Sequence, residues 1–251
     1  MLKSEEFMMK NYINASYIKG SMDNYDQNIF ISTQGPTKKT FDHFWRMIAL
    51  NGVRYIFMLC NLFEDTRVKC DQYWPSGVNE ILDLSNILIQ LISEDFIIAD
   101  QIIERKLKIT IGVKDNSDII EHYCSQIHII NWPDHSIPDD SISYKLFDTL
   151  VSLIDKNFAE SSNKTPIVVH CSAGVGRTGT LICLYTCYNL IMRQLKYVNT
   201  NELINEKSFL VSIFSVARKL REQRYLFITD VCQYKLIYHF IYEWIKNNCN
   251  L

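Results

Sequence analysis

The feature that most constrains this fold is a short apolar run that passes through a glycine-bearing loop into a long apolar helix, within residues 165–195. The run TPIVVH predicts a buried strand, and TLICLYTCYNLIMRQL predicts the helix. A strand that leads through a loop into a helix is typical of α/β domains, in which loops at the carboxyl ends of the strands form ligand sites. The loop CSAGVGRTG is therefore the first candidate for a functional site.

Apolar periodicity predicts a similar mixture of elements along the rest of the chain. We expect strands at 53–63, 87–92, 105–113 and 125–132 and helices at 41–52, 144–154, 208–223 and 232–245. Polar turns separate the short strands between Ile81 and Trp132, which is typical of antiparallel pairing. With 8 glycines and 5 prolines, the chain shows no linker. We therefore predict a single α/β domain over residues 1–251, with a central twisted mixed sheet flanked by helices.

The charge balance and the cysteine spacing exclude several classes of protein. The 26 basic residues are matched by 28 acidic ones without a long run of like charges, so we expect no nucleic-acid partner. No apolar window is long enough to span a membrane, and the N-terminus does not resemble a signal peptide, so we expect a cytoplasmic protein. The 8 cysteines show neither a disulfide framework nor metal-ligand spacing, so we expect free thiols and no metal or other cofactor.

Two cysteines are followed six residues later by an arginine, and only one of these pairs suits an anion site. Cys187 and Arg193 lie in an apolar, glycine-free segment with helical periodicity, so they cannot converge on one ligand. We assign Cys187 to the core of the helix. Cys171 and Arg177 lie in the glycine-bearing loop instead. The alternative, that Cys171 only packs in the core, explains neither the glycines nor the arginine.

The loop that follows Cys171 has the components of an anion-binding site. Gly174 and Gly176 allow backbone conformations in which successive N–H groups face a common centre. The N-terminus of the next helix favours negative charge, and the planar guanidinium of Arg177 can bind two phosphate oxygens at once. The same groups stabilise a thiolate, which is the nucleophilic form of cysteine. We therefore expect the nucleophile and the phosphate site to coincide.

The string VHCSAGVGRTG resembles the signature loop of the cysteine-dependent protein tyrosine phosphatases. Further segments similar to that family occur in the same order along nearly the whole chain, namely NYINASYI, TQGP, FDHFWRMI, KCDQYWP, QIHIINWPDHSIP, LREQR and CQYKLIY. The resemblance implies the protein tyrosine phosphatase fold. It also implies a hydrolase that removes phosphate from phosphotyrosine in signalling proteins through a cysteinyl-phosphate intermediate.

The resemblance implies roles for individual residues in this reaction. Cys171 would attack phosphorus, Arg177 would clamp the phosphate oxygens, and Asp134 in the WPD segment would protonate the departing tyrosine oxygen and later act as base toward water. An acid is needed because phenolate, whose conjugate acid has a pKa of about 10, leaves poorly unassisted. Thr178 would hydrogen-bond the sulfur, and His170 would tune the thiolate. Phosphate contacts from the loop are expected at Ser172, Ala173, Gly174, Val175 and Gly176.

Other residues receive supporting roles from the resemblance. Glu64 is expected to orient the clamping arginine, and Lys69 is expected to approach the closed acid loop. Gln233 would hold substrate or water in the hydrolytic step, and Trp132 would be a hinge and packing residue of the acid loop. Without the family match, an isolated glutamate, lysine or glutamine is usually only solvated. Residues 73–75 are expected to form core and turn rather than to take part in the chemistry.

The sequence departs from the family pattern at three places. Only eleven residues precede Tyr12, so we expect a shortened N-terminus without the tyrosine-bearing wall of the phosphotyrosine pocket. Thr229 stands where the family has the first glutamine of its water-positioning loop. Because the threonine hydroxyl is shorter, we expect slow hydrolysis of the cysteinyl-phosphate. Ser136 replaces a usual glycine, and we expect it to stiffen the acid loop.

Two functions other than an active phosphatase are consistent with part of this pattern. A phosphotyrosine-binding module with impaired turnover would capture phosphoproteins, but it would not need Asp134. Rhodanese-like sulfur transfer also uses a cysteine on an anion-binding loop, but it would not require the WPD or QGP segments. We expect a monomer whose partners are phosphotyrosine-containing proteins. The isoleucine- and asparagine-rich texture is similar to that of small phosphatases of insect-parasitoid viruses, which would imply a location in host cytoplasm.

Overall fold

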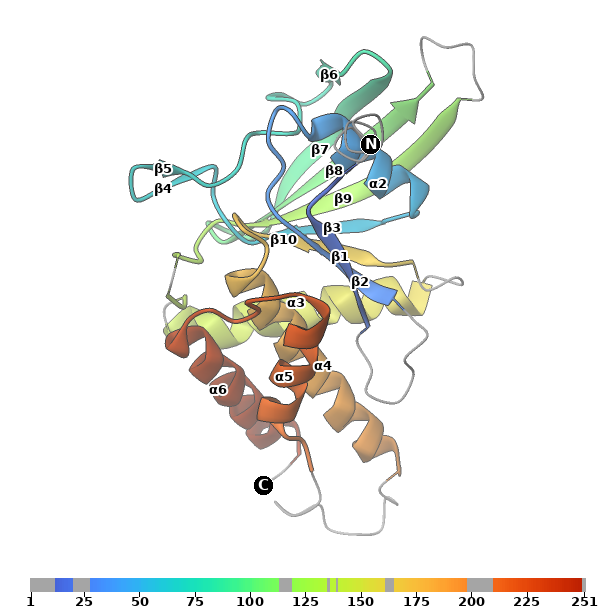
Figure 1. Ribbon diagram of the computed structural model, residues 1–251. Helices are drawn as coiled ribbons and strands as arrows, with labels where there is room; N and C mark the ends of the chain where they lie inside the picture. The colour runs from blue at the N-terminus through green and yellow to red at the C-terminus, as the bar shows by residue number, and fades with distance from the viewer. Residues whose placement is uncertain are drawn as a thin grey trace, which may run out of the picture.

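The centre of the molecule is one twisted sheet of eight strands (Figure 1). The computed structural model describes residues 12–19, 28–112, 119–134, 136–138, 140–160, 165–197 and 210–249. In spatial order, the strands of the sheet are β1 (Ala15–Lys19), β2 (Asn28–Thr33), β10 (Ile167–His170), β3 (Tyr55–Met58), β9 (Ile120–Ile129), β8 (Ile102–Ile111), β7 (Ile87–Ile98) and β6 (Ile81–Asp83). A separate hairpin pairs β4 (Phe63–Glu64) with β5 (Arg67–Val68).

The sheet is mixed, as the sequence predicts. β10 runs parallel to both β2 and β3, and β3 runs parallel to β9. The strands from β6 to β9 pair antiparallel, which confirms the antiparallel region predicted between Ile81 and Trp132. Because β2, β3, β9 and β10 point the same way, the segments that follow them lie at one edge of the sheet.

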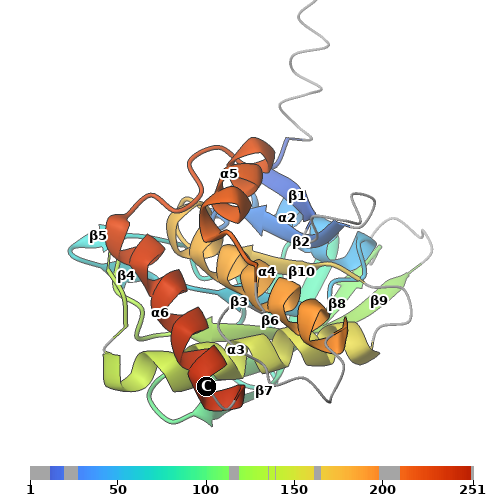
Figure 2. The ribbon, with the colours of Figure 1, turned by 90° about the horizontal axis from the view of Figure 1, so that it is seen from below.

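Helices cover both faces of the sheet. The long helices α3 (Asp140–Glu160), α4 (Gly176–Tyr197) and α6 (Val231–Asn248) lie with α5 (Ile213–Gln223) on one side, and α2 (Phe41–Leu50) lies on the other (Figure 1 and Figure 2). The apolar face predicted for the first helix is confirmed, since Phe41, Phe44, Trp45 and Ile48 are all buried. Among the described helices, none combines the length and apolarity that crossing a membrane requires.

The predicted start of α5 at residue 208 needs correction. The helix begins at Ile213 because the side chain of Ser212 caps it, accepting a hydrogen bond from the backbone N–H of Ser215 at 3.2 Å. Residues 198–209 lie outside the described residues, as does the start of the chain up to residue 11, where the shortened N-terminus was expected.

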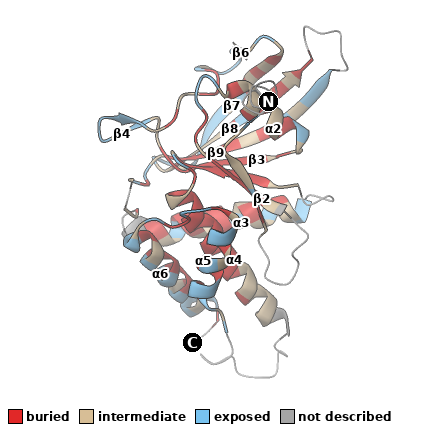
Figure 3. Ribbon diagram, in the orientation of Figure 1, coloured by how far each residue is buried: buried red, intermediate tan, exposed pale blue. Residues whose placement is uncertain are grey.

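The core follows the two faces of the central strands (Figure 3). Every residue of β10 is fully buried, which agrees with the unbroken apolar character of its sequence. Cys187 is also fully buried within α4, so its assignment to the core of the helix is confirmed. A rigid, buried strand therefore carries the chain up to Cys171.

Candidate active site

Four parallel strands deliver the candidate residues to one edge of the sheet. β2 leads into the TQGP segment, β3 into residues 59–64, β9 into the WPD segment and β10 directly into Cys171. This shared direction is what brings Glu64 against Arg177 across 113 positions of sequence.

Cys171 lies at the end of β10 and is only 4% exposed. The carbonyl oxygen of the next residue, Ser172, accepts a hydrogen bond from the backbone N–H of Gly35 at 2.8 Å, which ties the loop to the TQGP segment. Two other cysteines, Cys60 and Cys70, are buried nearby. Burial raises the pKa of Cys70 to about 12 and the pKa of Cys60 well above its ordinary value, so both remain protonated thiols at neutral pH.

The two glycines of the loop are required for different reasons. Gly174 has a φ of +71°, and a Cβ there would lie 2.1 Å from the carbonyl oxygen of Thr33. Gly176 begins α4 and is not among the described residues with positive φ, so no left-handed backbone requires a glycine there. It needs space instead, because a Cβ would lie 2.9 Å from Oγ1 of Thr229.

Arg224 holds the outer side of this loop, and the sequence analysis assigned it no role. Its Nε donates to the carbonyl oxygen of Gly174 at 2.9 Å, and Nη2 donates to that of Ala173 at 3.4 Å. The hydroxyl of Ser32 also donates to the Gly174 carbonyl, at 3.0 Å. In a trans peptide the N–H points opposite to the C=O, so the amides that follow these two carbonyls point away from Arg224. Arg224 thus favours a loop whose N–H groups are available to an anion.

The arginine of the loop is paired with a carboxylate from the β4–β5 hairpin. Arg177 is 1% exposed, and its Nη1 and Nη2 donate to the two carboxylate oxygens of Glu64 at 2.8 and 3.0 Å. Burial by itself lowers the pKa of Arg177, but the hydrogen bond to Glu64 and the neighbouring thiols raise it above its ordinary value. The orienting contact expected from Glu64 is therefore present.

The acid loop lies directly against this arginine. Nη1 of Arg177 donates to the carbonyl oxygen of Trp132 at 2.8 Å, and Nη2 lies 3.2 Å from Oδ1 of Asp134. The other carboxylate oxygen of Asp134 accepts from Nζ of Lys69, so the contact expected for Lys69 is also present. The Trp132 indole is buried, and its Nε1 donates to the carbonyl oxygen of Ser136 at 3.1 Å, which closes the loop on itself.

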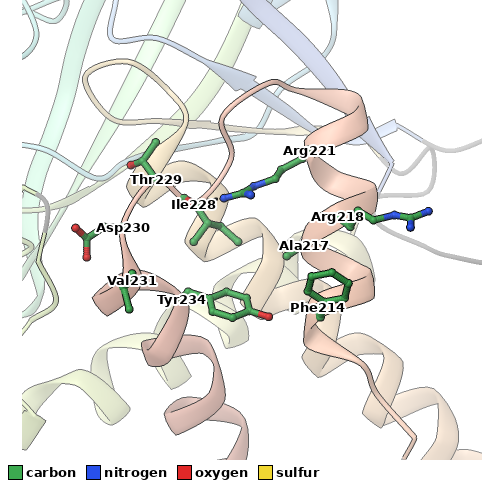
Figure 4. Close-up of a pocket in the computed structure, with 9 residues that line it drawn as sticks. All are labelled: Phe214, Ala217, Arg218, Arg221, Ile228, Thr229, Asp230, Val231 and Tyr234. Carbon is green, nitrogen blue, oxygen red and sulfur yellow. Dashed lines mark hydrogen bonds between the residues drawn. The ribbon is translucent and has the colours of Figure 1, made fainter.

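Residues expected to serve the hydrolytic step lie over the start of α4. Gln233 is 1% exposed, and its side chain lies within 3.5 Å of the position of a Cβ on Gly176. Among the residues that the structure describes, neither Oε1 of Gln233 nor Oγ1 of Thr178 has a hydrogen-bond partner, although both are buried. The bond expected from Thr178 to the sulfur is thus not formed here. Thr229 reaches the same place from the loop before α6 and also borders a groove of about 430 Å³ between α5 and α6 (Figure 4).

His170 directly precedes Cys171 and contacts its backbone carbonyl oxygen. It is fully buried; its Nδ1 lies 3.1 Å from the carbonyl oxygen of Cys171, and its Nε2 lies 2.7 Å from the hydroxyl of Tyr73. Burial, with Arg177 adding to the effect, lowers the pKa of His170 to about 4, so the ring is neutral at neutral pH. Tyr73 is fully buried as predicted, but its hydroxyl contacts His170, next to Cys171, and so does not belong to the core alone.

The whole arrangement suits a doubly charged oxyanion next to a nucleophile and an acid. Two cations, Arg177 and Lys69, meet two carboxylates, Glu64 and Asp134, beside Cys171 and a helix N-terminus. Within the described ranges, no group of three or more His, Cys, Asp or Glu side chains could hold a metal ion.

Known proteins match this chain along most of its length. A family model described as Protein-tyrosine phosphatase matches residues 2–243. Tyrosine-protein phosphatase 99A of Drosophila melanogaster is 34% identical over 238 residues, which are 94% of this chain and 16% of that protein. Tyrosine-protein phosphatase non-receptor type 20 of Rattus norvegicus is 31% identical over 238 residues, which are 95% of this chain and 50% of that protein. The chain spans half or less of the length of these relatives.

Solved structures match the fold as well. The crystal structure of the catalytic domain of human protein tyrosine phosphatase non-receptor type 18 has a TM-score of 0.74 at 28% identity, covering 95% of this chain and 77% of that chain. A structure of PTPN18 in complex with HER2-pY1196 phosphopeptides has a TM-score of 0.77 at 28% identity, covering 99% of this chain and 76% of that chain. The predicted fold, a central mixed sheet with flanking helices, is confirmed by these matches.

Proposed function

Since the chain belongs to the protein-tyrosine phosphatase family, we propose that it hydrolyses phosphotyrosine in proteins by a two-step covalent mechanism that needs no metal ion. The observation that carries this proposal is that the proposed acid, its loop and an orienting carboxylate all contact the guanidinium of Arg177. The guanidinium contacts Glu64 at 2.8 Å, the Trp132 carbonyl oxygen at 2.8 Å and Asp134 at 3.2 Å. Arg177 follows Cys171 by six residues in the sequence. The proposed clamp, Arg177, thereby contacts the proposed acid, Asp134, and lies close in sequence to the proposed nucleophile, Cys171.

The first step transfers the phosphoryl group to sulfur. The Cys171 thiolate attacks phosphorus, the S–P bond forms, and the bond from phosphorus to the tyrosine oxygen breaks. Asp134, protonated for this step, gives its proton to the departing oxygen, so tyrosine leaves as a neutral phenol. Arg177 and the loop amides stabilise the charge on the transferred oxygens, because fixed donors cost no reorganisation at the moment of reaction.

The second step returns the enzyme to its starting state. The Asp134 carboxylate takes a proton from water, the water oxygen bonds to phosphorus, and the S–P bond breaks to release inorganic phosphate and the thiolate. We assign this water to Gln233, whose side chain borders Gly176, whereas the neighbouring Thr229 hydroxyl is shorter than the glutamine of the family pattern. The roles of Ser172 through Gly176, Thr178 and His170 in these steps belong to the same proposal.

The ion pairs of Asp134 imply how substrate binding prepares the acid. Asp134 is shared between Arg177 and Lys69 and is 20% exposed, whereas the arginine is 1% exposed. A phosphate dianion that binds Arg177 competes for the same guanidinium. Losing this contact and gaining a nearby negative charge both favour the protonated carboxyl. Substrate binding thereby favours the form of Asp134 that the first step requires.

We propose phosphotyrosine-containing proteins as the partners and substrates. The PTPN18 structures in complex with HER2 phosphopeptides support this class of ligand for a chain with the same fold. We also propose a monomer that acts in the cytoplasm, and the relative named as non-receptor supports the proposed location.

The experiment is release of phosphate from a phosphotyrosyl peptide, with a phosphoseryl peptide of the same sequence as the specificity control. We expect turnover of the phosphotyrosyl peptide, no turnover by Cys171→Ser, and strongly reduced turnover by Asp134→Ala. No turnover by the wild-type protein would overturn the proposal. If the wild-type protein bound the phosphotyrosyl peptide without hydrolysing it, a phosphotyrosine-binding module with impaired turnover would be the better account of its function.

A further inference from the structure

A continuous series of buried polar side chains connects β8 to the nucleophile. Arg105, on β8, is 7% exposed, and its Nη1 donates to Oε1 of Gln126 on β9 at 3.0 Å. Nε2 of Gln126 donates to the Tyr73 hydroxyl at 2.7 Å, and that hydroxyl lies 2.7 Å from Nε2 of His170. Nδ1 of His170 lies 3.1 Å from the carbonyl oxygen of Cys171. Gln126, Tyr73 and His170 are fully buried, so water does not compete for these bonds.

The arginine sets the direction of every bond in this series. A guanidinium can only donate, so the group of Gln126 that faces Arg105 must be its oxygen. The amide NH₂ of Gln126 then faces Tyr73 and must donate to the hydroxyl oxygen. The Tyr73 hydroxyl hydrogen has two acceptors within reach, Nε2 of His170 at 2.7 Å and the weaker acceptor Sδ of Met58 at 3.8 Å. The shorter contact to the stronger acceptor favours donation to His170, whose Nε2 is then unprotonated. In the neutral ring the proton then sits on Nδ1 and is donated to the carbonyl oxygen of Cys171.

We propose that Arg105 and Gln126 are positioning residues that fix His170 as its Nδ1–H tautomer and so align a line of hydrogen-bond donors toward Cys171. The inference rests on the proposed function for its purpose, since a thiolate at Cys171 is what the aligned dipoles stabilise. The opposite tautomer would place the Nδ1 lone pair against the Cys171 carbonyl oxygen, and the bond between Tyr73 and His170 would point away from the sulfur.

Three further contacts hold the guanidinium of Arg105 in place. Its Nε pairs with Glu94 at 2.5 Å, and its guanidinium lies 4.6 Å from the ring centroid of Trp74. Its Nη1 also lies 3.1 Å from Nδ1 of His128. By the same donor argument the His128 proton sits on Nε2, which donates to the carbonyl oxygen of Cys60 at 2.9 Å. One arginine therefore fixes the tautomers of two buried histidines.

The test must account for the other charges near the nucleophile. The charged and titratable groups around His170 and Cys171, from all the elements packed around them, are Cys60, Glu64, Lys69, Cys70, Tyr73, Arg105, His128, Asp134, Arg177 and Arg224. Each of them contributes to any pH profile of Cys171. The tautomer of His170 is therefore read directly by ¹⁵N NMR of the imidazole, and the thiolate is read by the rate of alkylation with iodoacetamide.

The decisive variant is Gln126→Glu, which keeps the shape of the side chain and reverses its hydrogen bond to tyrosine. A carboxylate accepts from Arg105 and from the Tyr73 hydroxyl, so Nε2 of His170 must donate instead. We expect the wild-type ring to carry its proton on Nδ1 and the variant ring to carry it on Nε2. We also expect alkylation of the variant to be about tenfold slower at about pH 6. A wild-type proton on Nε2, or a variant with an unchanged tautomer, would overturn the inference.

Controls separate tautomer reversal from the added negative charge. In a Tyr73→Phe background the series is interrupted, so Gln126→Glu should no longer move the His170 proton. Gln90→Glu adds the same charge on β7, outside the series, and should leave the tautomer unchanged. If Gln126→Glu does not fold, Gln126→Met serves instead: mixed tautomers and slower alkylation support the inference, and wild-type values overturn it. Neither readout involves substrate, so failure here is distinguishable from absence of phosphatase activity.

Discussion

Nη1 of Arg177 donates a hydrogen bond to the carbonyl oxygen of Trp132 at 2.8 Å, which ties the start of α4, after the loop that carries Cys171, to the backbone of the WPD segment. The same guanidinium also holds Glu64 and Asp134. In the proposed mechanism, a single buried side chain thus couples the phosphate site to the residue that supplies the proton. Changes at this arginine or at its partners are expected to affect binding and proton transfer together.

Removing the carboxylate that holds this arginine should impair both stability and catalysis. We expect Glu64→Ala to lower the free energy of unfolding by about 3 kcal/mol, because it leaves a buried cation without its main partner. We expect kcat/KM to fall roughly tenfold to a hundredfold, since Arg177 is no longer fixed. Chemical denaturation and phosphopeptide kinetics measure the two effects.

The matched control is Glu160→Ala, which breaks the exposed pair with Arg54, whose side chains are 37% and 43% exposed. An exposed pair contributes about 1 kcal/mol or less, so this variant should behave as the wild type. Equal losses in the two variants would contradict the account of the clamp.

The loop glycine should be irreplaceable for reasons of space as well as conformation. Gly174→Ala places a Cβ 2.1 Å from the Thr33 carbonyl oxygen at a φ of +71°, so the loop must move and its anion site should be lost. Gly52→Ala is the control, because its φ is +62° but its nearest contact would be 3.5 Å. We expect Gly52→Ala to cost about 1 kcal/mol of stability and no phosphate affinity. Calorimetric titration with inorganic phosphate compares the affinities of the two variants. Phosphate binding by Gly174→Ala at wild-type affinity would refute the prediction that the anion site is lost.

Hydrolysis of the cysteinyl-phosphate should limit turnover. The Thr229 hydroxyl is shorter than a glutamine amide, so we expect a burst of phenol product followed by a slower steady rate. Thr229→Gln should raise the steady rate and lower the amplitude of the burst, because accelerating only the second step leaves less cysteinyl-phosphate accumulated. Stopped-flow kinetics with a chromogenic aryl phosphate resolve both phases. A wild-type trace without a burst would count against this assignment.

Acid should destabilise the fold through two buried histidines. Burial lowers the pKa of His170 to about 4 and that of His128 to about 3, from an ordinary value of about 6.5 in the unfolded chain. Between these values the unfolded state binds more protons, so stability falls as pH falls. Each histidine contributes about 1.4 kcal/mol per pH unit. Urea titrations between about pH 6.5 and 5 should show this slope, and His128→Gln should roughly halve it. A slope unchanged in that variant would contradict the assignment.

Sequence patterns predicted the elements well because each is encoded locally. The apolar face of α2, the buried strand β10 and the antiparallel strands β7 to β9 depend on residues a few positions apart. The start of α5 was placed too early because a single cap, Ser212, decides it. At the site, the resemblance anticipated the contacts of Glu64 and Lys69 with their partners.

What the sequence did not predict depends on pairs far apart in the chain. Arg224 reaches Gly174 across 50 positions, and Tyr73 reaches His170 across 97. No local periodicity reports such contacts. One signal was present, since Gln126 and His128 alternate with Ile127 and Ile129 at the buried end of β9. Polar side chains at buried strand positions must find hydrogen-bond partners, and these two find Arg105.

The measurement that tests the central claim most directly is the identity of the covalent intermediate. The protein is mixed with a phosphotyrosyl peptide, quenched in acid during the burst, digested and examined by mass spectrometry. The account predicts one phosphate on the peptide that carries Cys171, with none in the Cys171→Ser protein. Turnover without phosphate on this peptide, or phosphate on a different residue, would contradict it.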